Sequence, residues 1–392
     1  MNRGYSHIVI GAGAIGAAAA YWLSDAPGTN VLVLEQDELA GTRNSSGDVS
    51  RIIRHAYHST AYTALTRAMF QSWDEVEQDA GMRLYLKTGG LDLATADAGS
   101  LASLDAYRAA LAAQGIPFED LDAEEIRHRW PQWVIEDDVT GMFQEDGGLI
   151  DIRASVSAHL SLARARGAEL RPHTRVTGIQ VHSGSVTVQT TAGEFHGEHL
   201  VVAAGSWLGE LMPDLGLNYR LTLSQEQVSY FSTPLLRDFT PEKFPVWIFH
   251  GQQDYYGFPV YGEPAVKIAR DMRARFIESS DRVFEGDDEE AALLEEFLQQ
   301  WLPAAVGPVH ANRTCVYDMP PDRDFVLDTV PGAPHVAVFN GAGHAGKFAS
   351  LMGRILADLL TAGRTAHPIE AFSLRRPAIT DPDFVPTFHL TH

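Results

Sequence analysis

The chain has 392 residues, 45% of them hydrophobic and 21% charged, a composition that excludes disordered and fibrous proteins and predicts a globular protein of two domains or interleaved lobes. Its 30 Lys plus Arg against 51 Asp plus Glu give a net charge of −21, which repels nucleic acid and anionic lipid, so we expect neither as a partner. No apolar run approaches the roughly 20 residues of a membrane span, and a signal-peptide pattern is missing. The single cysteine cannot form an internal disulfide, which fits a reducing compartment. We expect a cytoplasmic protein that is a monomer or a homodimer.

The first 35 residues alternate between strand and helix patterns. Apolar runs at 7–10 and 31–34 flank an alanine-rich stretch at 17–23, and a glycine turn follows the first run. Short, continuously apolar runs are typical of parallel strands that are buried on both faces and joined by a crossover helix. The chain therefore opens as an α/β protein.

The remaining elements are spread along the whole chain. Helical spacing of apolar residues predicts helices over 62–80, 101–113, 151–167 and about 346–362, and an amphipathic helix that begins in the acidic run 285–296. Strand patterns occur at 87–93, after Pro131, three times within 176–203, near 225–232 and 246–260, and at 336–339. We expect the strands near 225–260 to form an antiparallel second lobe, and we place a domain crossing near the acidic turn at 145–148.

A glycine-rich turn follows the first strand. Gly11, Gly13 and Gly16 satisfy the G-x-G-x-x-G pattern, and Glu35 ends the next strand 19 residues after Gly16. Gly11 permits the tight turn, Gly13 lets a pyrophosphate approach the helix N-terminus and Gly16 allows close packing, while Glu35 can accept hydrogen bonds from ribose hydroxyls. Glycine turns also occur for packing reasons, but the flanking strand, helix and acid favour a dinucleotide, either NAD or FAD.

Two further segments carry candidate ligand-binding groups. Arg51 and Arg54 stand three residues apart, so on a helix they would share a face. They are either a fork for a carboxylate or another anion, or surface arginines whose stems cover apolar neighbours. Residues 341–347 form a second glycine-rich turn, which aims backbone N–H groups and Lys347 at one point. This turn suits a group that becomes anionic, or it is a simple helix start with an exposed lysine.

Eight stretches together resemble one enzyme family. They are GAGAIG with Glu35, SRIIRHAY, KTGGLDL, VVAAGSW at 201–207, YYGFP at 255–259, TCVYD at 314–318, PDRDFVLDTVP at 321–331 and GAGHAGKFAS at 341–350. The family is that of monomeric sarcosine oxidase and N-methyltryptophan oxidase, the FAD-dependent amine and amino-acid oxidases of the D-amino-acid oxidase superfamily. The resemblance runs in order from about residue 5 to about residue 375.

The resemblance implies a two-lobed α/β (α+β) fold, with the flavin ring between the lobes. One lobe is a Rossmann-type FAD-binding domain, expected at 1–84, 148–216 and 313–392. The other is an interleaved antiparallel-sheet domain that binds the substrate, expected at 85–147 and 217–312.

The resemblance also implies roles for single side chains. Arg54 and Lys347 would hold the substrate carboxylate. Lys267 would activate oxygen, because a cation beside the flavin ring stabilises the developing superoxide. Tyr256 and Tyr317 would line the amine pocket. From the residues alone, the alternatives are that Lys267 is a strand lysine that points to solvent and that the two tyrosines are core aromatics.

The expected cofactor is FAD, bonded covalently to the protein. The resemblance matches Cys315 with the cysteine that is bonded to the flavin 8α-methyl group, whereas a lone cysteine is more usually a small buried hydrophobe. Arg51 would lie over the ring and assist this attachment, and His344 would face the pyrimidine end of the flavin. The expected cofactor contacts are Gly11, Gly13, Ala14, Ile15, Gly16, Glu35, Ser50, Arg51, Val176, Ala204, Gly205, Trp207, Cys315, Gly341, Gly343, His344, Ala345, Gly346 and Lys347, with no metal.

Three departures from the family pattern bear on the substrate. Ser45 and Ser46 stand where the family has paired histidines, and the second glycine turn reads HAGKF rather than HGFKF. Asp271, which we include among the candidate catalytic residues, replaces a histidine four residues after Lys267. A carboxylate there would favour a cationic group on the substrate and oppose a second anion.

We therefore predict hydride transfer to flavin N5 from the carbon next to a secondary amine, with an N-methyl amino acid as the substrate. Imine hydrolysis and reduction of O2 to hydrogen peroxide would follow. The alternatives are a flavin-dependent oxidase or dehydrogenase of a cyclic or larger amino acid, and a flavoprotein without turnover. An NAD-dependent dehydrogenase is supported only by the shared glycine fingerprint.

Overall fold

The computed structural model describes residues 4–388, and its first sheet contains the N-terminal α/β unit. Strands β12 (Gly193–Val202), β1 (Tyr5–Ile10), β2 (Val31–Leu34) and β9 (Glu169–Arg171) are parallel neighbours. The sheet is extended by the antiparallel strands β10 (Val176–His182) and β11 (Ser185–Thr190), and by β20 (Ala333–Asn340), which is parallel to β12 and pairs with β19 (Val326–Val330). The predicted α/β opening and the three strands within 176–203 are confirmed.

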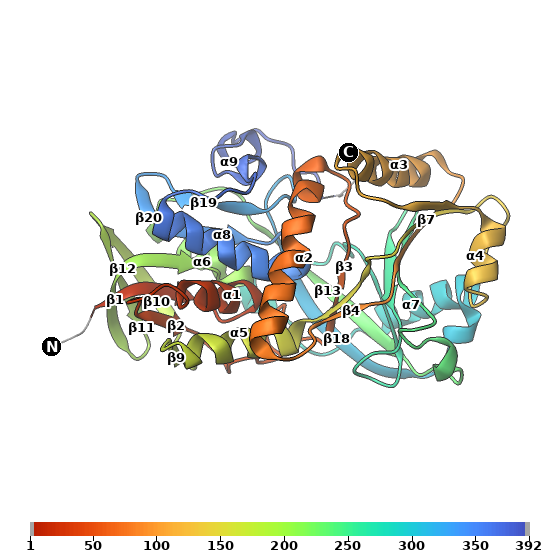
Figure 1. The fold of residues 1–392 in the computed structure, drawn as a ribbon, viewed down its shortest axis with the longest axis horizontal. Helices are drawn as coiled ribbons and strands as arrows, with labels where there is room; N and C mark the ends of the chain where they lie inside the picture. The colour runs from red at the N-terminus through yellow and green to blue at the C-terminus, as the bar shows by residue number, and fades with distance from the viewer. Residues whose placement is uncertain (1–3, 389–392) are drawn as a thin grey trace.

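Helices from both ends of the chain pack on this sheet. They are α1 (Ala14–Leu23), α5 (Ile152–Ala165) and α8 (Ala349–Ala362), which gather around β1 and β2 on the left of Figure 1. Helix α1 contacts α8 closely because Gly353 lacks a side chain, and a Cβ there would meet the Ala18 carbonyl carbon at 2.5 Å. Helix α8 begins three residues later than predicted, since a 3-10 turn (Ala345–Phe348) precedes it, and it ends at Gly363 with φ +69°.

The second sheet holds the other lobe. Its strands are β17 (Phe276–Ile277), β13 (Thr222–Phe231), β16 (Val266–Arg270), β15 (Tyr255–Phe258), β14 (Val246–His250), β5 (Gly90–Ala94), β7 (Thr140–Gln144) and β6 (Glu119–Leu121), in that order, with β18 (Val309–Met319) also paired to β13. All neighbours are antiparallel except β14 and β5. The predicted antiparallel lobe is therefore confirmed, with one parallel pair inside it.

Helices cover the outer part of this sheet. Helix α7 (Asp288–Trp301) packs its apolar side, including Leu294 and Phe297, into a core with Trp247 and Phe249. The helix is opened by the acidic run, as predicted, and Asp287 caps it by accepting from the N–H of Glu289 and Glu290. Helices α3 (Ala98–Ala113) and α4 (Ala123–Arg129) lie at the far right of Figure 1.

A small three-stranded sheet corrects two expectations. It joins β3 (Ser50–Ile53), β8 (Gly148–Asp151) and β4 (Tyr85–Lys87). The single strand predicted at 87–93 is divided, because Gly89 turns the chain at φ +77° and sends β4 and β5 into different sheets. Arg51 lies on strand β3 and Arg54 just beyond its end, so the helical face considered for this pair is wrong.

Helix α2 (Thr60–Ala80) crosses the middle of the molecule between the two large sheets (Figure 1). Ser59 caps its N-terminus, and Gly81 ends it in the left-handed conformation at φ +63°. Its buried residues, among them Leu65, Met69 and Trp73, follow helical spacing as predicted. No helix within residues 4–388 is long and apolar enough to cross a membrane.

Candidate active site

One continuous cavity collects almost all of the predicted site residues. It begins at the glycine turn before α1, passes between β2 and the segment after β12, and ends between the two large sheets. Every predicted cofactor and catalytic residue lines it except two, Gly16 and Ser50. Gly16 packs against the turn itself, where a Cβ would lie 1.8 Å from the Gly11 carbonyl oxygen. Position 16 therefore requires glycine for packing rather than for contact with a ligand.

The glycine turn presents backbone rather than side chains to the cavity. Gly11 has φ +92°, and a Cβ there would meet the Ala203 carbonyl oxygen at 2.4 Å, so the turn requires glycine. The carboxylate of Glu35 accepts from the N–H of Ala12 at 2.8 Å and from that of Asp37 at 3.0 Å. The N-terminus of α1 therefore faces the cavity, with an acidic side chain fixed beside it.

Ser46 contacts the start of α1. Its Oγ accepts a hydrogen bond from the Ala14 N–H at 3.0 Å, so one of the free N–H groups at this helix end is already satisfied. Its neighbour Ser45 binds a different part of the cavity wall, because its Oγ donates to the Val316 carbonyl oxygen at 2.8 Å. The two serines that depart from the family pattern thus join the glycine turn to β18.

Val176, Ala204, Gly205 and Trp207 form the side of the cavity opposite the glycine turn. The guanidinium of Arg282 lies over the Trp207 ring at 5.7 Å. All three of its nitrogens are buried, and they find no hydrogen-bond acceptor among residues 4–388. An unsatisfied buried guanidinium is costly, so it is a ready partner for an anion.

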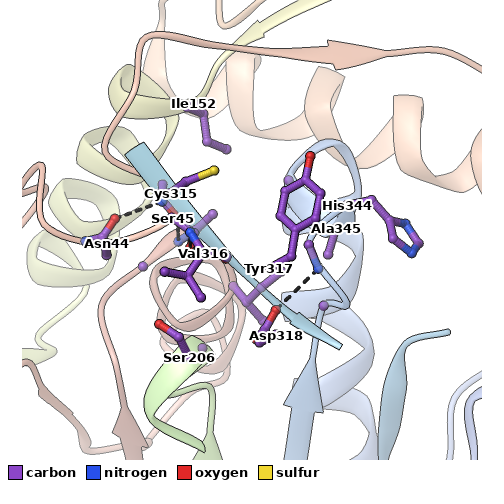
Figure 2. Close-up of a pocket in the computed structure, with 18 of the residues that line it drawn as sticks. Asn44, Ser45, Ile152, Ser206, Cys315, Val316, Tyr317, Asp318, His344 and Ala345 are labelled. Carbon is purple, nitrogen blue, oxygen red and sulfur yellow. Dashed lines mark hydrogen bonds between the residues drawn. The ribbon is translucent and has the colours of Figure 1, made fainter. Parts of the chain in front are cut away.

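Strand β18 carries the TCVY stretch, and all four of its residues line the cavity. Figure 2 shows Cys315 and Tyr317 on one side of the strand, with Val316 and Asp318 on the other. Burial raises the pKa of the Cys315 thiol to about 11, the Arg51 guanidinium lowers it, and the Glu226 carboxylate raises it further. Asp318 accepts from the N–H of Gly343 at 3.3 Å and so fixes the second glycine turn to the strand.

Arg51 lies against that second glycine turn. A Cβ on Gly346 would lie 3.0 Å from Arg51 Cγ, so the absence of a side chain at 346 makes room for the arginine stem. Arg51 donates to the Ser50 carbonyl oxygen at 2.7 Å, and its Nη1 lies 3.5 Å from the carboxylate of Asp48. The guanidinium is therefore held at the cavity wall close to Cys315.

Lys267 lies at the centre of an ion-pair cluster. Its Nζ lies 2.5 Å from Asp48 Oδ2 and donates to the Ser50 carbonyl oxygen at 2.8 Å, while Tyr230 donates to Asp48 Oδ1 at 2.7 Å. Burial lowers the pKa of Lys267 to about 8, although Asp48 opposes this. Burial alone would raise the pKa of Asp48, but Lys267 and Arg51 hold it well below its usual range. Lys267 is thus a buried cation with a buried counter-ion.

Lys347 has a different environment. Its Nζ donates to the Tyr57 hydroxyl at 3.1 Å and to the His344 carbonyl oxygen at 3.2 Å, and the part of the chain that the structure describes gives it no carboxylate partner. Burial lowers the pKa of Lys347 to about 7, and the nearby guanidinium of Arg54 lowers it further. Lys347 is therefore a buried amine that gains charge readily when an anion arrives.

The His344 ring is directed into the protein rather than toward Cys315 (Figure 2). Its Nδ1 pairs with the Tyr57 hydroxyl at 2.7 Å and its Nε2 with the Arg323 carbonyl oxygen at 3.1 Å, while the ring stacks on Phe325 at 4.7 Å. Burial holds the pKa of His344 well below its usual value. Only the backbone of this residue is left to serve a ligand.

Arg54 is paired inside the protein. Its guanidinium binds the carboxylate of Asp92 and lies 4.9 Å from the Tyr107 ring centroid. Asp92 also contacts His250 at 3.1 Å, and hydrogen bonds to Asp254 and Asp92 raise the pKa of His250 to about 9 against the effect of burial. Arg54 Nε has no acceptor within residues 4–388, so one donor remains free.

Asp271 is also paired. Its two oxygens accept from the Arg323 guanidinium at 2.7 and 2.9 Å, an arrangement of the bidentate kind. Burial would raise the pKa of Asp271, but Arg323 holds it below its usual value. The predicted preference for a cationic substrate group requires a carboxylate whose charge is not neutralised. The ion pair with Arg323 neutralises most of the charge of Asp271.

Tyr256 and Tyr317 line the cavity near Asp271. Burial raises the pKa of both phenols, so both remain protonated at neutral pH. Phe258 lies on the same strand as Tyr256, and the Lys267 ammonium lies 4.3 Å from its ring centroid. The wall between the two lysines is thus aromatic.

Several residues of this arrangement were not predicted, among them Asp48, Tyr57, Asp92 and Arg323. Tyr57, Asp92 and Arg323 lie in three of the stretches that carry the resemblance, and Asp48 lies two residues before the stretch that holds Tyr57. Their partners are 38 to 290 residues away along the chain, so only the folded structure shows that they neutralise or hold the cavity cations.

Comparison with known proteins agrees with this geometry. Residues 6–359 match the model of the family described as DAO, FAD dependent oxidoreductase. The chain is 33% identical to monomeric sarcosine oxidase of Streptomyces avermitilis over 96% of this chain and 99% of the relative, and 31% identical to N-methyl-L-tryptophan oxidase of Escherichia coli over 95% and 99%.

A solved structure is also similar. It is the open form of NikD, described as an unusual amino acid oxidase essential for nikkomycin biosynthesis, with a TM-score of 0.82 at 26% identity over 95% of this chain and 98% of that one. The match of a family model to most of the chain, together with a relative of 33% identity over almost its full length, identifies the chain as a member of the FAD dependent oxidoreductase family.

Proposed function

We propose that this protein is an FAD-dependent oxidase of secondary amines whose substrates are N-methyl amino acids. The observation that carries the proposal is the pair of buried lysines on one cavity. Lys347 has no ion-pair partner within the described residues and suits a substrate carboxylate, while Lys267, on the same cavity, is held as a fixed positive charge by Asp48. The relatives that are named as sarcosine and N-methyl-L-tryptophan oxidases act on this class of compound.

The cavity has the groups that FAD requires. The turn at 11–16 offers a helix N-terminus to the pyrophosphate, Glu35 is placed beside it for the ribose, and Arg282 has three unsatisfied buried nitrogens next to Trp207. The predicted contacts around Arg51, Cys315 and the second glycine turn would then surround the isoalloxazine ring. When bound, FAD supplies the two-electron chemistry, taking electrons from the carbon next to the amine and passing them to O2.

The residues of the chain position the substrate. The ammonium of Lys347 and the free Nε of Arg54 would hold the carboxylate, and Asp92 would fix the plane of the Arg54 guanidinium. The protonated phenols of Tyr256 and Tyr317 would line the space around the amine. Asp271 would act through Arg323, which it fixes beside Tyr317, rather than as a free anion.

Lys267 would serve the oxygen step. A buried cation stabilises the negative charge that develops when O2 accepts the first electron. Asp48 and the Ser50 carbonyl oxygen keep the Lys267 ammonium protonated and fixed in place. We further propose that Cys315 forms the thioether to the flavin and that Arg51 assists it. Retention of flavin by acid-precipitated protein, and its loss in Cys315→Ala, would support the linkage.

We also propose two domains with the boundaries given above, and β18 of the second sheet crosses the boundary at 313. The FAD-binding domain comprises 1–84, 148–216 and 313–392, and the substrate domain comprises 85–147 and 217–312. We propose a monomer or homodimer in the cytoplasm, where a single unpaired cysteine stays reduced.

An anaerobic titration tests the function. The purified protein is mixed without oxygen with sarcosine, N-methyl aromatic amino acids, proline or pipecolate, and is then exposed to air. We expect an N-methyl amino acid to bleach the flavin absorption band, and air to restore the band with release of hydrogen peroxide. Bleaching by proline or pipecolate alone would indicate that the substrates are cyclic amines. A flavin band that no amine bleaches would contradict the proposal.

A further inference from the structure

Glu226 is a buried carboxyl group on the strand next to Cys315, which lines the cavity. Its side chain is 1% exposed, and the ladder between β13 and β18 pairs it directly with Cys315. Residues directly opposite each other in an antiparallel pair share one face, with Cβ atoms about 4.5–5.5 Å apart. Val228, two residues along β13, lines the cavity, as does Cys315. Glu226 and Cys315 are therefore neighbours on the same face of the sheet.

The partners of Glu226 are neutral. Its Oε1 accepts from the Ser224 hydroxyl at 2.5 Å and its Oε2 from the Arg273 backbone N–H at 2.8 Å. No ion pair to Glu226 is found within residues 4–388, in contrast to Asp48, Asp92 and Asp271. Burial raises the pKa of Glu226 to about 7, so the group exchanges a proton near neutral pH.

Cys315 needs a proton acceptor before it can form a bond to carbon. The thiolate is the nucleophilic form of cysteine, and burial holds the pKa of this thiol far above neutral. Arg51 favours the thiolate, but it has no free lone pair with which to take the proton. A base on the same face of the sheet is therefore required.

We propose that Glu226 accepts the proton of the Cys315 thiol when the thioether to FAD forms, which rests on the proposed function and on Cys315 as the attachment site. The S–H bond breaks and its proton goes to Glu226, one C–H bond of the flavin 8α-methyl group breaks and its proton goes to solvent, and a C–S bond forms. The electron pair passes into the flavin ring, which is reduced. Dioxygen then takes the two electrons and two protons as hydrogen peroxide, and Glu226 returns to its starting state.

Other carboxyl groups near the pair are paired with cations or lie on the other side of β18. Asp48 binds Lys267, and Asp271 binds Arg323. Asp318, the nearest other carboxyl group on β18, lies on the opposite side of the strand from Cys315 (Figure 2) and accepts from the Gly343 N–H. The charged and titratable groups that act on Glu226 or Cys315 from the surrounding elements are Asp48, Arg51, Tyr256, Lys267, Arg270, Asp271, Arg273, Arg282, Tyr317 and Arg323. Within this set, Glu226 is the carboxylate that lacks a cationic partner.

The test measures covalent incorporation of FAD rather than turnover. Full-length protein produced in riboflavin-starved cells, so that it carries no flavin, is mixed with FAD in air. The flavin that stays with acid-precipitated protein is followed over time between pH 5.5 and 9. For the wild type we expect a rate that rises tenfold per pH unit and levels off above about pH 7. Glu226→Gln should slow covalent incorporation about 100-fold, which is the scale of lost general-base catalysis. Quenching of flavin fluorescence measures noncovalent binding of FAD, which should be unchanged in this variant.

Matched variants separate chemistry from packing. Glu226→Asp keeps the carboxylate and should recover part of the rate. Glu75→Gln changes an exposed carboxylate that pairs with Arg354 outside the cavity, and should keep the wild-type rate. A wild-type rate or pH profile in Glu226→Gln would overturn the inference.

The outcomes also distinguish this inference from the proposed function. Wild-type protein that never retains flavin after acid would remove both the thioether and the role of Glu226, whereas the anaerobic titration would still decide the oxidase activity. If Glu226→Gln does not capture FAD, Glu226→Asp decides. A slower rate in Glu226→Asp protein that captures FAD normally supports Glu226, and a wild-type rate and pH profile in this variant contradict it.

Discussion

The two buried lysines of the cavity differ in the groups that neutralise their positive charge. Lys267 has the Asp48 carboxylate 2.5 Å away, whereas Lys347 has only the Tyr57 hydroxyl at 3.1 Å and a backbone carbonyl oxygen at 3.2 Å. A buried charge is tolerated when it is paired and shifts its pKa when it is not. The protein therefore fixes one positive charge permanently and leaves the other to be completed by a ligand. Arg54 resembles Lys267 in this respect, because Asp92 pairs with it.

The largest effect should come from breaking the Arg54 pair. Asp92→Asn leaves a buried guanidinium without its counter-ion, so we expect the free energy of unfolding to fall by about 3–5 kcal/mol. Urea denaturation measures this. Asp105→Asn breaks an exposed ion pair with Arg108 instead and should leave the midpoint unchanged. Equal midpoints for Asp92→Asn and the wild type would show that Asp92 does not stabilise Arg54.

Removing the fixed charge should affect the oxygen step. In Lys267→Met we expect reoxidation of the reduced protein by O2 to slow by about 100- to 1,000-fold, because a preorganised charge is lost. Anaerobic reduction by the substrate should change far less. Stopped-flow absorption measures both steps. Lys243→Met, at an exposed lysine that pairs with Asp238, is the matched control, and an equal loss in both steps would argue against a specific oxygen role.

Replacing Lys347 should weaken the binding of carboxylates. In Lys347→Met we expect the dissociation constant of a simple carboxylate such as propionate to rise about 10- to 100-fold, as for a lost hydrogen bond to a charged group. Reoxidation by O2 should stay near the wild-type rate. Titration of the flavin absorption band measures the binding. Weaker binding in Lys267→Met but not in Lys347→Met would reverse the assignment of the two lysines.

The smallest effect is a pH dependence. The pKa of Lys347 is lowered to about 7, so the amine is neutral above that pH and charged below it. Carboxylate affinity should therefore be constant below pH 7, fall by up to tenfold per pH unit above it, and become flat in Lys347→Met. Arg54, Asp271, Arg51 and Arg323 also act on this lysine, but all four keep their charge over this range. Tighter binding of the carboxylate at higher pH would contradict the expected direction of this pH dependence.

The sequence predicted the fold and the outline of the site because both depend on local patterns. The glycine turns, the apolar strands and the amphipathic helices are determined by residues close together in the chain, and nearly all predicted cofactor contacts line one cavity. The split at Gly89 and strand β3 were missed because a short segment with mixed polarity fits several structures.

The charge state of the site could not be predicted in the same way. Asp271 was expected as a free anion, and the structure pairs it with Arg323, 52 residues away along the chain. Likewise, the partners of Lys267 and Arg54 come from other strands of the sheet system. Whether a buried group is neutralised depends on these long-range contacts, and a single sequence does not place them.

The order of strands in the first sheet also has a consequence for biosynthesis. Strand β20 and helix α8, from residues 333–362, pack on β12 and α1, which come from the first 202 residues. A nascent chain that has emerged from the ribosome only as far as residue 332 would carry the whole turn at 11–16 but none of the second glycine turn. The complete set of proposed cofactor contacts therefore exists only after residues 341–347 have been made, and a product truncated before them would lack the second glycine turn.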